Sequence, residues 1–366
     1  MMQARQVANT SSIVSSVRGT ADRDAAEREL ARHRVALPTA QSVDWMRLQN
    51  VSDALLLVAR DASGHPRRAL SAAIARSRAL PGHRVYRVER LSAGESAADD
   101  ATILEALASM AKDDRRCLRV IVEIFERDRE NRERLGGQLG ELAFSRVAAP
   151  RMYERTVGLE LEGTEEQLFA GLDKTARRHI RAPAKRGLEL RPIADVAFAP
   201  RIDALLEETF KRTNGGLQRL PWNRIIEWSL EAPNVSRVVG LFDPATPGLE
   251  SLVSMAWGCA HGTYATYEAG AGVRRPDLGS TPVSYAPLWD LITWSRRETT
   301  ATWFDLGGAS SGDASDSLAG NLEFKRYFSE LIVDVGEEWQ LEPHAVRATI
   351  ARVIAAGARL AKSVRS

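Results

Sequence analysis

The chain has 366 residues, and 50 Lys and Arg against 48 Asp and Glu leave a formal net charge of only +2. At about 150 residues per domain, this length predicts two domains. Shares of 44% apolar and 27% charged residues argue against wholesale disorder. The near-neutral charge excludes a protein that coats nucleic acid over its whole surface, but it leaves room for a local basic patch.

The short apolar runs disfavour a membrane span, and the cysteines indicate a cytoplasmic protein. The longest, at 54–59 and 252–256, are far shorter than the roughly 20 residues that span a bilayer. No hydrophobic signal-peptide core stands near the start. Cys117 and Cys259 are lone thiols in apolar stretches, which is typical of a reducing compartment and of buried packing residues.

Several chemistries are disfavoured by missing motifs. The six histidines are scattered without HExxH spacing, so no metal site is expected. No Walker A motif, no GxGxxG after a strand and no GxSxG elbow is present. We therefore expect no permanently bound cofactor.

The first half alternates helices and strands. A loose leader over 1–20 precedes a charged helix at 22–33, and both belong to a first segment, 1–40. Strands are expected at 51–60, 68–74, 85–88 and 117–125, and helices at 101–111 and 127–142. This alternation predicts an α/β layer.

The second half repeats this pattern. We expect strands at 156–161, 188–192, 236–242 and 302–306, a hairpin of 252–259 with 263–269, and helices from Thr164, at 202–212, 221–230 and 287–297. Seven of the eight tryptophans lie at or beyond position 222, so this half should hold the larger aromatic core. A final helix at 345–364 should place Arg347, Arg352 and Arg359 on its wet side.

Four segments, in order, carry a resemblance to a known family. They are Gln41-Ser-Val-Asp-Trp45, Leu168 to Gly187, Thr209-Phe-Lys-Arg212, and Phe304-Asp-Leu-Gly-Gly308 followed by Leu322 to Phe328. Together, over residues 41–336, they resemble the Fem-type (FemAB) branch of the GNAT acyltransferase superfamily.

The resemblance implies an α/β fold of two tandem GNAT-like domains, each a mixed central sheet flanked by helices, with a cleft between them. The expected domains are 41–155 and 156–340, and the last segment, 341–366, should pack back on the first domain. The long coiled-coil hairpin of some family members has no counterpart here. Family members join an activated acyl group to an amine. The donor is an acyl-CoA or an aminoacyl-tRNA, and the acceptor is an amine of a cell-envelope, sugar or peptide molecule.

The family match places Lys325, beside Phe324, near the reacting carbonyl. Acyl transfer passes through a tetrahedral oxyanion, which a fixed ammonium in a dry cleft stabilises. The alternative is an ordinary exposed lysine beside Arg326.

A basic run precedes Gly187. Its cations are Lys174, Arg177, Arg178, Arg181, Lys185 and Arg186, with no acid among them. Lys174, Arg178, Arg181 and Lys185 recur at spacings that put them on one helical face, where they could meet phosphates of tRNA, CoA or a nucleotide sugar, or form a solvated surface. Pro183 should kink or end this helix.

Other residues complete the expected site. The resemblance puts Arg212 against an acceptor's phosphate or carboxylate, although an exposed helix-end cation is the alternative. Glu268 is a candidate proton acceptor, and alternation along the strand puts it with Tyr264 on one face and Tyr267 on the other. Asp305 either steers the amine or caps a turn. Trp45, Tyr267 and Phe324 are the remaining candidate substrate contacts, with Trp45 at the domain junction.

The sequence does not choose the donor. Arg275 and Gly279 are one residue too far apart for the pyrophosphate loop of CoA-using GNAT enzymes. A non-catalytic GNAT-like module that binds a phosphorylated ligand or RNA is the alternative function, and a scaffold in envelope assembly is a third. The acyl group, the acceptor and the oligomeric state are not predicted.

Overall fold

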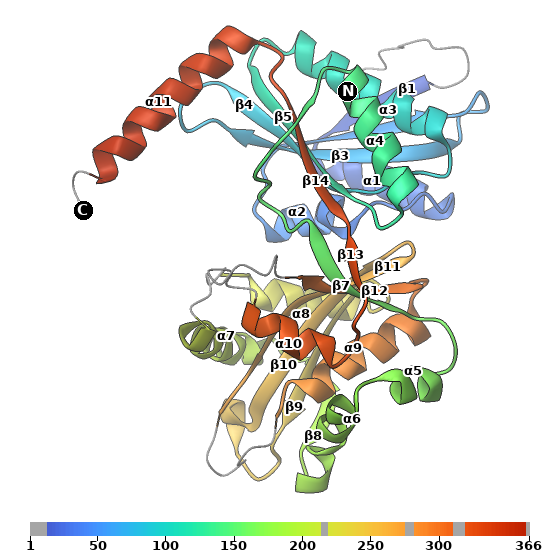
Figure 1. Ribbon diagram of the computed structural model, residues 1–366, viewed down its shortest axis with the longest axis vertical. Helices are drawn as coiled ribbons and strands as arrows, with labels where there is room; N and C mark the ends of the chain where they lie inside the picture. Colours follow the sequence, from blue (N-terminus) through green and yellow to red (C-terminus); the bar gives the residue numbers. More distant parts are fainter. Residues whose placement is uncertain (1–12, 214–218, 275–281, 310–318, 364–366) are drawn as a thin grey trace. The chain divides into compact units, whose positions relative to one another are not determined.

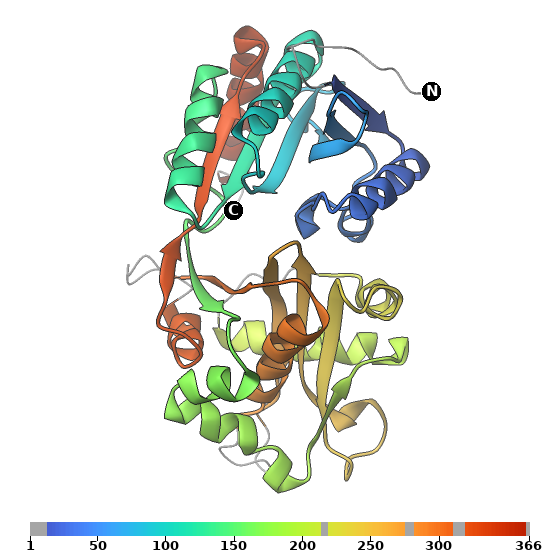
Figure 2. The ribbon, with the colours of Figure 1, turned by 90° about the vertical axis from the view of Figure 1, so that its right-hand side faces the viewer.

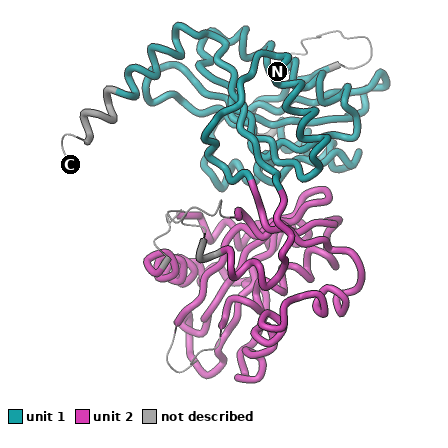
Figure 3. The backbone as a smooth tube through the Cα atoms, in the orientation of Figure 1, with its two compact units in different colours: residues 1–154, 334–366 teal, residues 155–333 magenta. Residues whose placement is uncertain are grey.

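The computed structural model describes residues 13–213, 219–274, 282–309 and 319–363. The chain divides into two compact units (Figure 3), which we call unit 1 (residues 1–154 and 334–366) and unit 2 (residues 155–333). Each unit holds a seven-stranded mixed sheet with helices packed on it (Figure 1). The predicted α/β class, with a central mixed sheet in each of two tandem domains, is confirmed.

The sheet of unit 1 has one parallel pair. Its strands, in spatial order, are β1 (Ile13–Arg18), β2 (Ala54–Arg60), β3 (Pro66–Arg76), β4 (Arg84–Leu91), β5 (Cys117–Phe125), β14 (Gly336–Leu341) and β6 (Ser145–Arg146). Strands β4 and β5 run parallel, and the other neighbours are antiparallel. The helices are α1 (Thr20–Arg32), α2 (Val43–Leu48), α3 (Ala97–Asp113), α4 (Arg129–Glu141) and α11 (Ala345–Ser363), with a 3-10 turn η1 (Thr39–Gln41).

Strand β2 shows why helices cover both faces of this sheet. Leu55 and Leu57 belong to the core under α3 and α4, whereas Leu56 and Val58 pack beneath α1. All four side chains are at most 1% exposed. A strand that is apolar on both faces has to be buried on both, so α1 and the α3–α4 pair lie on opposite sides.

Two expected boundaries are corrected. Residues 13–18, expected in a loose leader, form edge strand β1, which pairs along its length with β2. Residues 336–341, expected in the second domain, form β14 between β5 and β6 of unit 1. Both strands are formed by pairing with strands that are distant in the sequence, so their own residues gave no clear strand signal.

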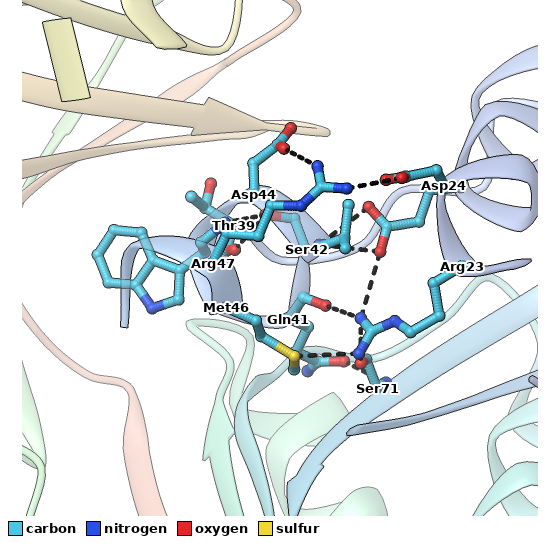
Figure 4. Close-up of polar contacts among 12 residues, drawn as sticks. Arg23, Asp24, Thr39, Gln41, Ser42, Asp44, Met46, Arg47 and Ser71 are labelled. Carbon is cyan, nitrogen blue, oxygen red and sulfur yellow. Dashed lines mark hydrogen bonds and ion pairs between the residues drawn. The ribbon is translucent and has the colours of Figure 1, made fainter. Parts of the chain in front are cut away.

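Gln41, the first residue of the Gln-Ser-x-x-Trp segment, supports the sheet of unit 1. Its side chain is 1% exposed, donates from Nε2 to the Glu89 carbonyl at 2.7 Å and accepts at Oε1 from the Ser71 amide at 2.9 Å. The β3–β4 ladder stops at Ala73 and Arg87, so Gln41 bridges two backbone groups that no longer reach each other. Figure 4 shows Arg23 beside it, donating to the Gln41 carbonyl and to Ser71 Oγ.

Replacing Gln41 by Ala should destabilise the protein by about 2–4 kcal/mol, because the Ser71 amide and the Glu89 carbonyl both lose the side chain that bonds them. The free energy of unfolding in urea measures this. Gln138→Ala is the matched control, since the half-buried Gln138 side chain makes one bond, to the Ala97 carbonyl. Equal losses in both variants would contradict a bridging role for Gln41.

The sheet of unit 2 has the same plan. Its strands, in spatial order, are β13 (Ile332–Asp334), β7 (Arg155–Glu160), β12 (Trp303–Gly308), β11 (Tyr264–Gly272), β10 (Leu252–His261), β9 (Ser236–Phe242) and β8 (Glu189–Pro192). Strands β11 and β12 run parallel, while β8 to β11 pair antiparallel, as do β12 and β7. The expected hairpin around His261-Gly262 is confirmed as β10 and β11.

Helices cover this sheet as well (Figure 2). They are α5 (Glu165–Gly171), α6 (Lys174–Arg181), α7 (Ala199–Thr213), α8 (Trp222–Glu231), α9 (Tyr285–Glu298) and α10 (Ala319–Arg326), with 3-10 turns η2 (Ala184–Arg186), η3 (Val196–Phe198) and η4 (Gly248–Ser251). Helices α6, α9 and α10 share one hydrophobic core with β7 and β12. Trp222, Trp257, Trp294 and Trp303 are fully buried, as the tryptophan distribution led us to expect.

Candidate active site

The parallel strands of unit 2 separate beside the family's Phe-Asp-x-Gly-Gly segment. Strands β11 and β12 pair only from Tyr264 with Trp303 to Thr266 with Asp305. Further along, none of the described residues of β11 pairs with β12. The two strands therefore diverge from each other directly after Asp305.

Asp305 is the last paired residue of β12 before this divergence. It is 0% exposed, accepts a short hydrogen bond from Thr156 Oγ1 of β7 and accepts from the Gly307 amide at 2.7 Å. Gly307 has φ +89°, and the register of β12 with β7 shifts between Asp305 and Gly308. Asp305 therefore stabilises the irregular end of β12, which agrees with the turn-capping alternative. Its steering of an amine stays a prediction.

Lys325 of α10 lies against this strand end. Its side chain is buried, at 7% exposed, and Nζ donates to the Gly308 carbonyl at 2.8 Å. A Cβ on Gly307 would lie 3.2 Å from Nζ, so glycine leaves room for the ammonium. The alternative of an ordinary exposed lysine is wrong.

Burial lowers the pKa of Lys325 to about 8, and the nearby Asp305 carboxylate opposes that shift. The ammonium form still predominates at pH 7. A lysine has three donors, and the bond to Gly308 uses one of them. The remaining N–H groups of a buried ammonium can stabilise a developing oxyanion.

The same pKa predicts how stability depends on pH. Below pH 8 the folded and unfolded forms both carry the Lys325 ammonium, and burying it destabilises the fold. Between pH 8 and 10.5 the folded form loses its proton first, so the free energy of unfolding should rise, by roughly 3 kcal/mol in total. Urea unfolding at pH 7 and 10 should show this rise relative to Lys325→Met. A constant difference between the two proteins would contradict it.

Glu268 and Tyr267 occupy a β-bulge on β11. Gly258 pairs with Tyr267 and Trp257 with Ala269, so Glu268 is the extra residue. The regular alternation expected between Tyr267 and Glu268 is therefore wrong, because a bulge interrupts the period of two. A Cβ on Gly270 would lie 1.8 Å from Tyr267 Oη, so the tyrosine ring covers that glycine. Burial raises the pKa of Tyr267 well above its usual range.

Phe324 belongs to an aromatic cluster that joins α10 to α9 and α6. Its ring centroid lies 4.8 Å from Tyr285 and 5.5 Å from Phe328. The Tyr285 ring in turn contacts His179 at 4.8 Å. This packing fixes the helix that carries Lys325. A substrate contact of Phe324 stays a prediction.

The predicted basic stripe lines a groove of about 800 Å³ on unit 2, which we call the basic groove. Its lining residues are Glu165, Glu166, Phe169, Ala170, Lys174, Arg177, Arg178, Arg181, Lys185 and Trp289. Five cations face two acids, and Glu165 is paired with Arg297. The Arg181 guanidinium lies 4.6 Å from the centroid of the Phe169 ring, which in turn lies 5.4 Å from that of Trp289.

The local sequence builds this groove. Thr164 forms a capping box with Gln167 at the start of α5, and Asp173 caps α6. Pro183 comes two residues after α6 ends, as predicted, and the turn η2 carries Lys185 to the groove. The proline thus redirects the chain without removing Lys185 from the stripe.

Arg212 and Trp45 lie in other parts of the fold. Arg212 of α7 is exposed, bonds Glu208 at 3.3 Å and donates to the Gly272 carbonyl at 3.4 Å, so it reaches the end of β11. Trp45 is half-buried on α2 of unit 1, where Ser42 caps the helix. Their contacts with substrate stay predictions, and the segment from Arg275 to Gly279 lies outside the described residues.

Sequence reasoning missed three participants. Thr156 orients Asp305, and Phe169 and Trp289 line the basic groove. Phe169 stands inside the second family segment, five residues before the first cation, so it could have been found there. Thr156 and Trp289 have no sequence signal, because only the tertiary fold brings them to these places.

Other chemistries find no support in the described part of the chain. Among those residues, no group of three or more His, Cys, Asp or Glu is placed to hold a metal ion. No helix in the same ranges has the length and apolar character needed to cross a membrane. Cys117 and Cys259 are buried free thiols, and burial raises the pKa of Cys117 to about 12, so it is unreactive.

Comparison with solved structures identifies the fold. No protein-family model matches the sequence, and no curated protein matches it either. Among solved structures, FemX matches with a TM-score of 0.71 at 13% identity, covering 88% of this chain and 96% of FemX. The chain therefore has the tandem GNAT fold of the Fem type, as the resemblance implied.

Two further structures are similar at lower scores. One is the C-terminal domain of an Agrobacterium fabrum protein assigned as a lysylphosphatidylglycerol synthetase, with TM-score 0.51, 12% identity and coverages of 92% and 97%. The other is L-PGS from Bacillus licheniformis, with TM-score 0.50, 10% identity and coverages of 90% and 95%. At these identities the likeness concerns the fold alone.

Proposed function

We propose that the protein is an amide-forming N-acyltransferase. It transfers an acyl or aminoacyl group from an acyl-CoA or an aminoacyl-tRNA to a primary amine of a cell-envelope, sugar or peptide acceptor. The observation that carries this proposal is the buried Lys325 ammonium beside the end of β12. The Fem-type fold supports it, and the buried thiols support a cytoplasmic location.

The reaction forms one bond and breaks another. The neutral amine attacks the carbonyl carbon of the thioester or ester, and Lys325 donates a hydrogen bond to the resulting oxyanion. The intermediate collapses to the amide and expels either the CoA thiolate or the ribose oxygen, which takes up a proton from water or from the group that accepted the amine proton. The amine proton leaves to Glu268 or to water, and positioning two substrates together supplies much of the rate gain.

The basic groove holds the phosphates of the donor or acceptor in this proposal. Arginine forks bind phosphate oxygens in pairs, and the Phe169 and Trp289 rings offer faces against which a base can pack. Two phosphorylated donors fit these properties, so the assay has to decide between them.

The test supplies the protein with radiolabelled acetyl-CoA, longer acyl-CoAs and aminoacyl-tRNAs, each with a panel of amino sugars and peptides. Label should appear in an amide with one donor class. The second candidate function is a binding module, which the basic groove favours because it exists independently of Lys325. Tight binding of phosphorylated ligands without transfer from any donor would support that module and contradict the enzyme.

A further inference from the structure

The last helix of unit 1 exposes its apolar side chains. Val346, Ile350, Val353 and Ile354 of α11 are 76%, 47%, 68% and 44% exposed. Their spacing of i, i+4, i+7 and i+8 places them on one face of the helix. Four large aliphatic side chains in water on one surface indicate a binding face.

The attachment of α11 to unit 1 uses a different face. Ala348 is 3% exposed, His344 contacts the Asp114 carbonyl at 3.2 Å, and Arg347 donates to the Arg115 carbonyl. Figure 1 shows α11 extending away from the rest of unit 1. The expected packing of the last segment on the first domain is thus limited, among its described side chains, to the start of the helix, and the bulky residues face outward.

The charge of this segment is strongly one-sided. Residues 343–366 contain Arg347, Arg352, Arg359, Lys362 and Arg365 and no acid, in a chain whose net charge is only +2. Arg347 and Arg352 are exposed; the helical spacing places Arg352 on the side away from the aliphatic residues and Arg347 at their flank, next to Ile354. Arg352 pairs with Glu342, the last acid of the sequence.

We propose that α11 is an interfacial anchor that lies on an anionic lipid membrane, with Val346, Ile350, Val353 and Ile354 inserted between the lipids. A basic amphipathic helix binds such surfaces because its aliphatic face leaves water while its cations meet lipid phosphates. Nucleic acid would satisfy the cations but leave the aliphatic side chains uncovered. A second copy of α11 would bring like charges together.

Vesicle co-sedimentation of the full-length protein tests this. Binding to vesicles of phosphatidylglycerol and phosphatidylcholine (1:1) is expected to be at least tenfold tighter than to pure phosphatidylcholine vesicles, and 0.5 M NaCl should weaken it. Ile350→Ser/Val353→Ser should lower binding about tenfold. Leu230→Ser is the matched control, since Leu230 of α8 is 52% exposed and lies in unit 2.

Three outcomes would overturn the proposal. They are no binding to the anionic vesicles, equal binding by the serine double variant, and a dimer in sedimentation velocity that the double variant abolishes. All three substituted side chains are exposed on helix surfaces, and circular dichroism checks that the variants fold. Acyl transfer in solution is measured separately, so failure of either proposal leaves the other standing.

Discussion

Replacing Lys325 by Met is expected to slow acyl transfer by about 100- to 1000-fold while leaving the affinity for the phosphorylated donor within about twofold. The side chain keeps its length and loses its charge, so the oxyanion loses a hydrogen-bond donor that ground-state binding does not need. Single-turnover rates with saturating donor measure the chemical step.

Arg326→Met is the matched control for that variant. Arg326 is the next cation on α10 and is exposed, whereas Lys325 is 7% exposed. The control should keep nearly full activity. Because burial lowers the pKa of Lys325, the Met variant should also be at least as stable as the parent at pH 7. Unchanged rates in Lys325→Met would remove the catalytic assignment.

The second large effect is expected at the basic groove. Arg178→Ala/Arg181→Ala should weaken binding of a phosphorylated ligand about 100-fold, since charge-assisted hydrogen bonds contribute about 1.5–3 kcal/mol each. Fluorescence anisotropy with adenosine 3′,5′-bisphosphate and with a short single-stranded RNA measures it. For the RNA, the slope of log affinity against log salt should fall by about 1.4.

The control for the groove is Arg186→Ala/Lys211→Ala. Both residues are exposed, and neither lines the groove, although Arg186 belongs to the same basic run. This variant should bind almost as the parent does. An equal loss of affinity in both double variants would show a general electrostatic effect. No loss of affinity in either would show that the basic stripe is only a solvated surface.

Local signals in the sequence predicted much of unit 2. Thr164 begins α5 by a capping box, Pro183 comes just after α6 ends, and Gly262 turns the hairpin between β10 and β11. Each of these features depends on residues within a few positions, where backbone sterics and side-chain caps act directly. The spacing of the cations likewise predicted that Lys174, Arg178 and Arg181 share one surface, and Arg177 lines the same groove without having been placed on that face.

The tertiary structure alone decided the remaining features. Edge strand β1 and inserted strand β14 exist because distant strands complete their hydrogen bonds, and Asp305 meets Thr156 from 149 positions away. The sequence by itself determined two α/β domains, a basic helix and a lysine that matches a family position. Burial of that lysine against Gly307, and exposure of the apolar face of α11, depend on packing between distant residues, which no local pattern encodes.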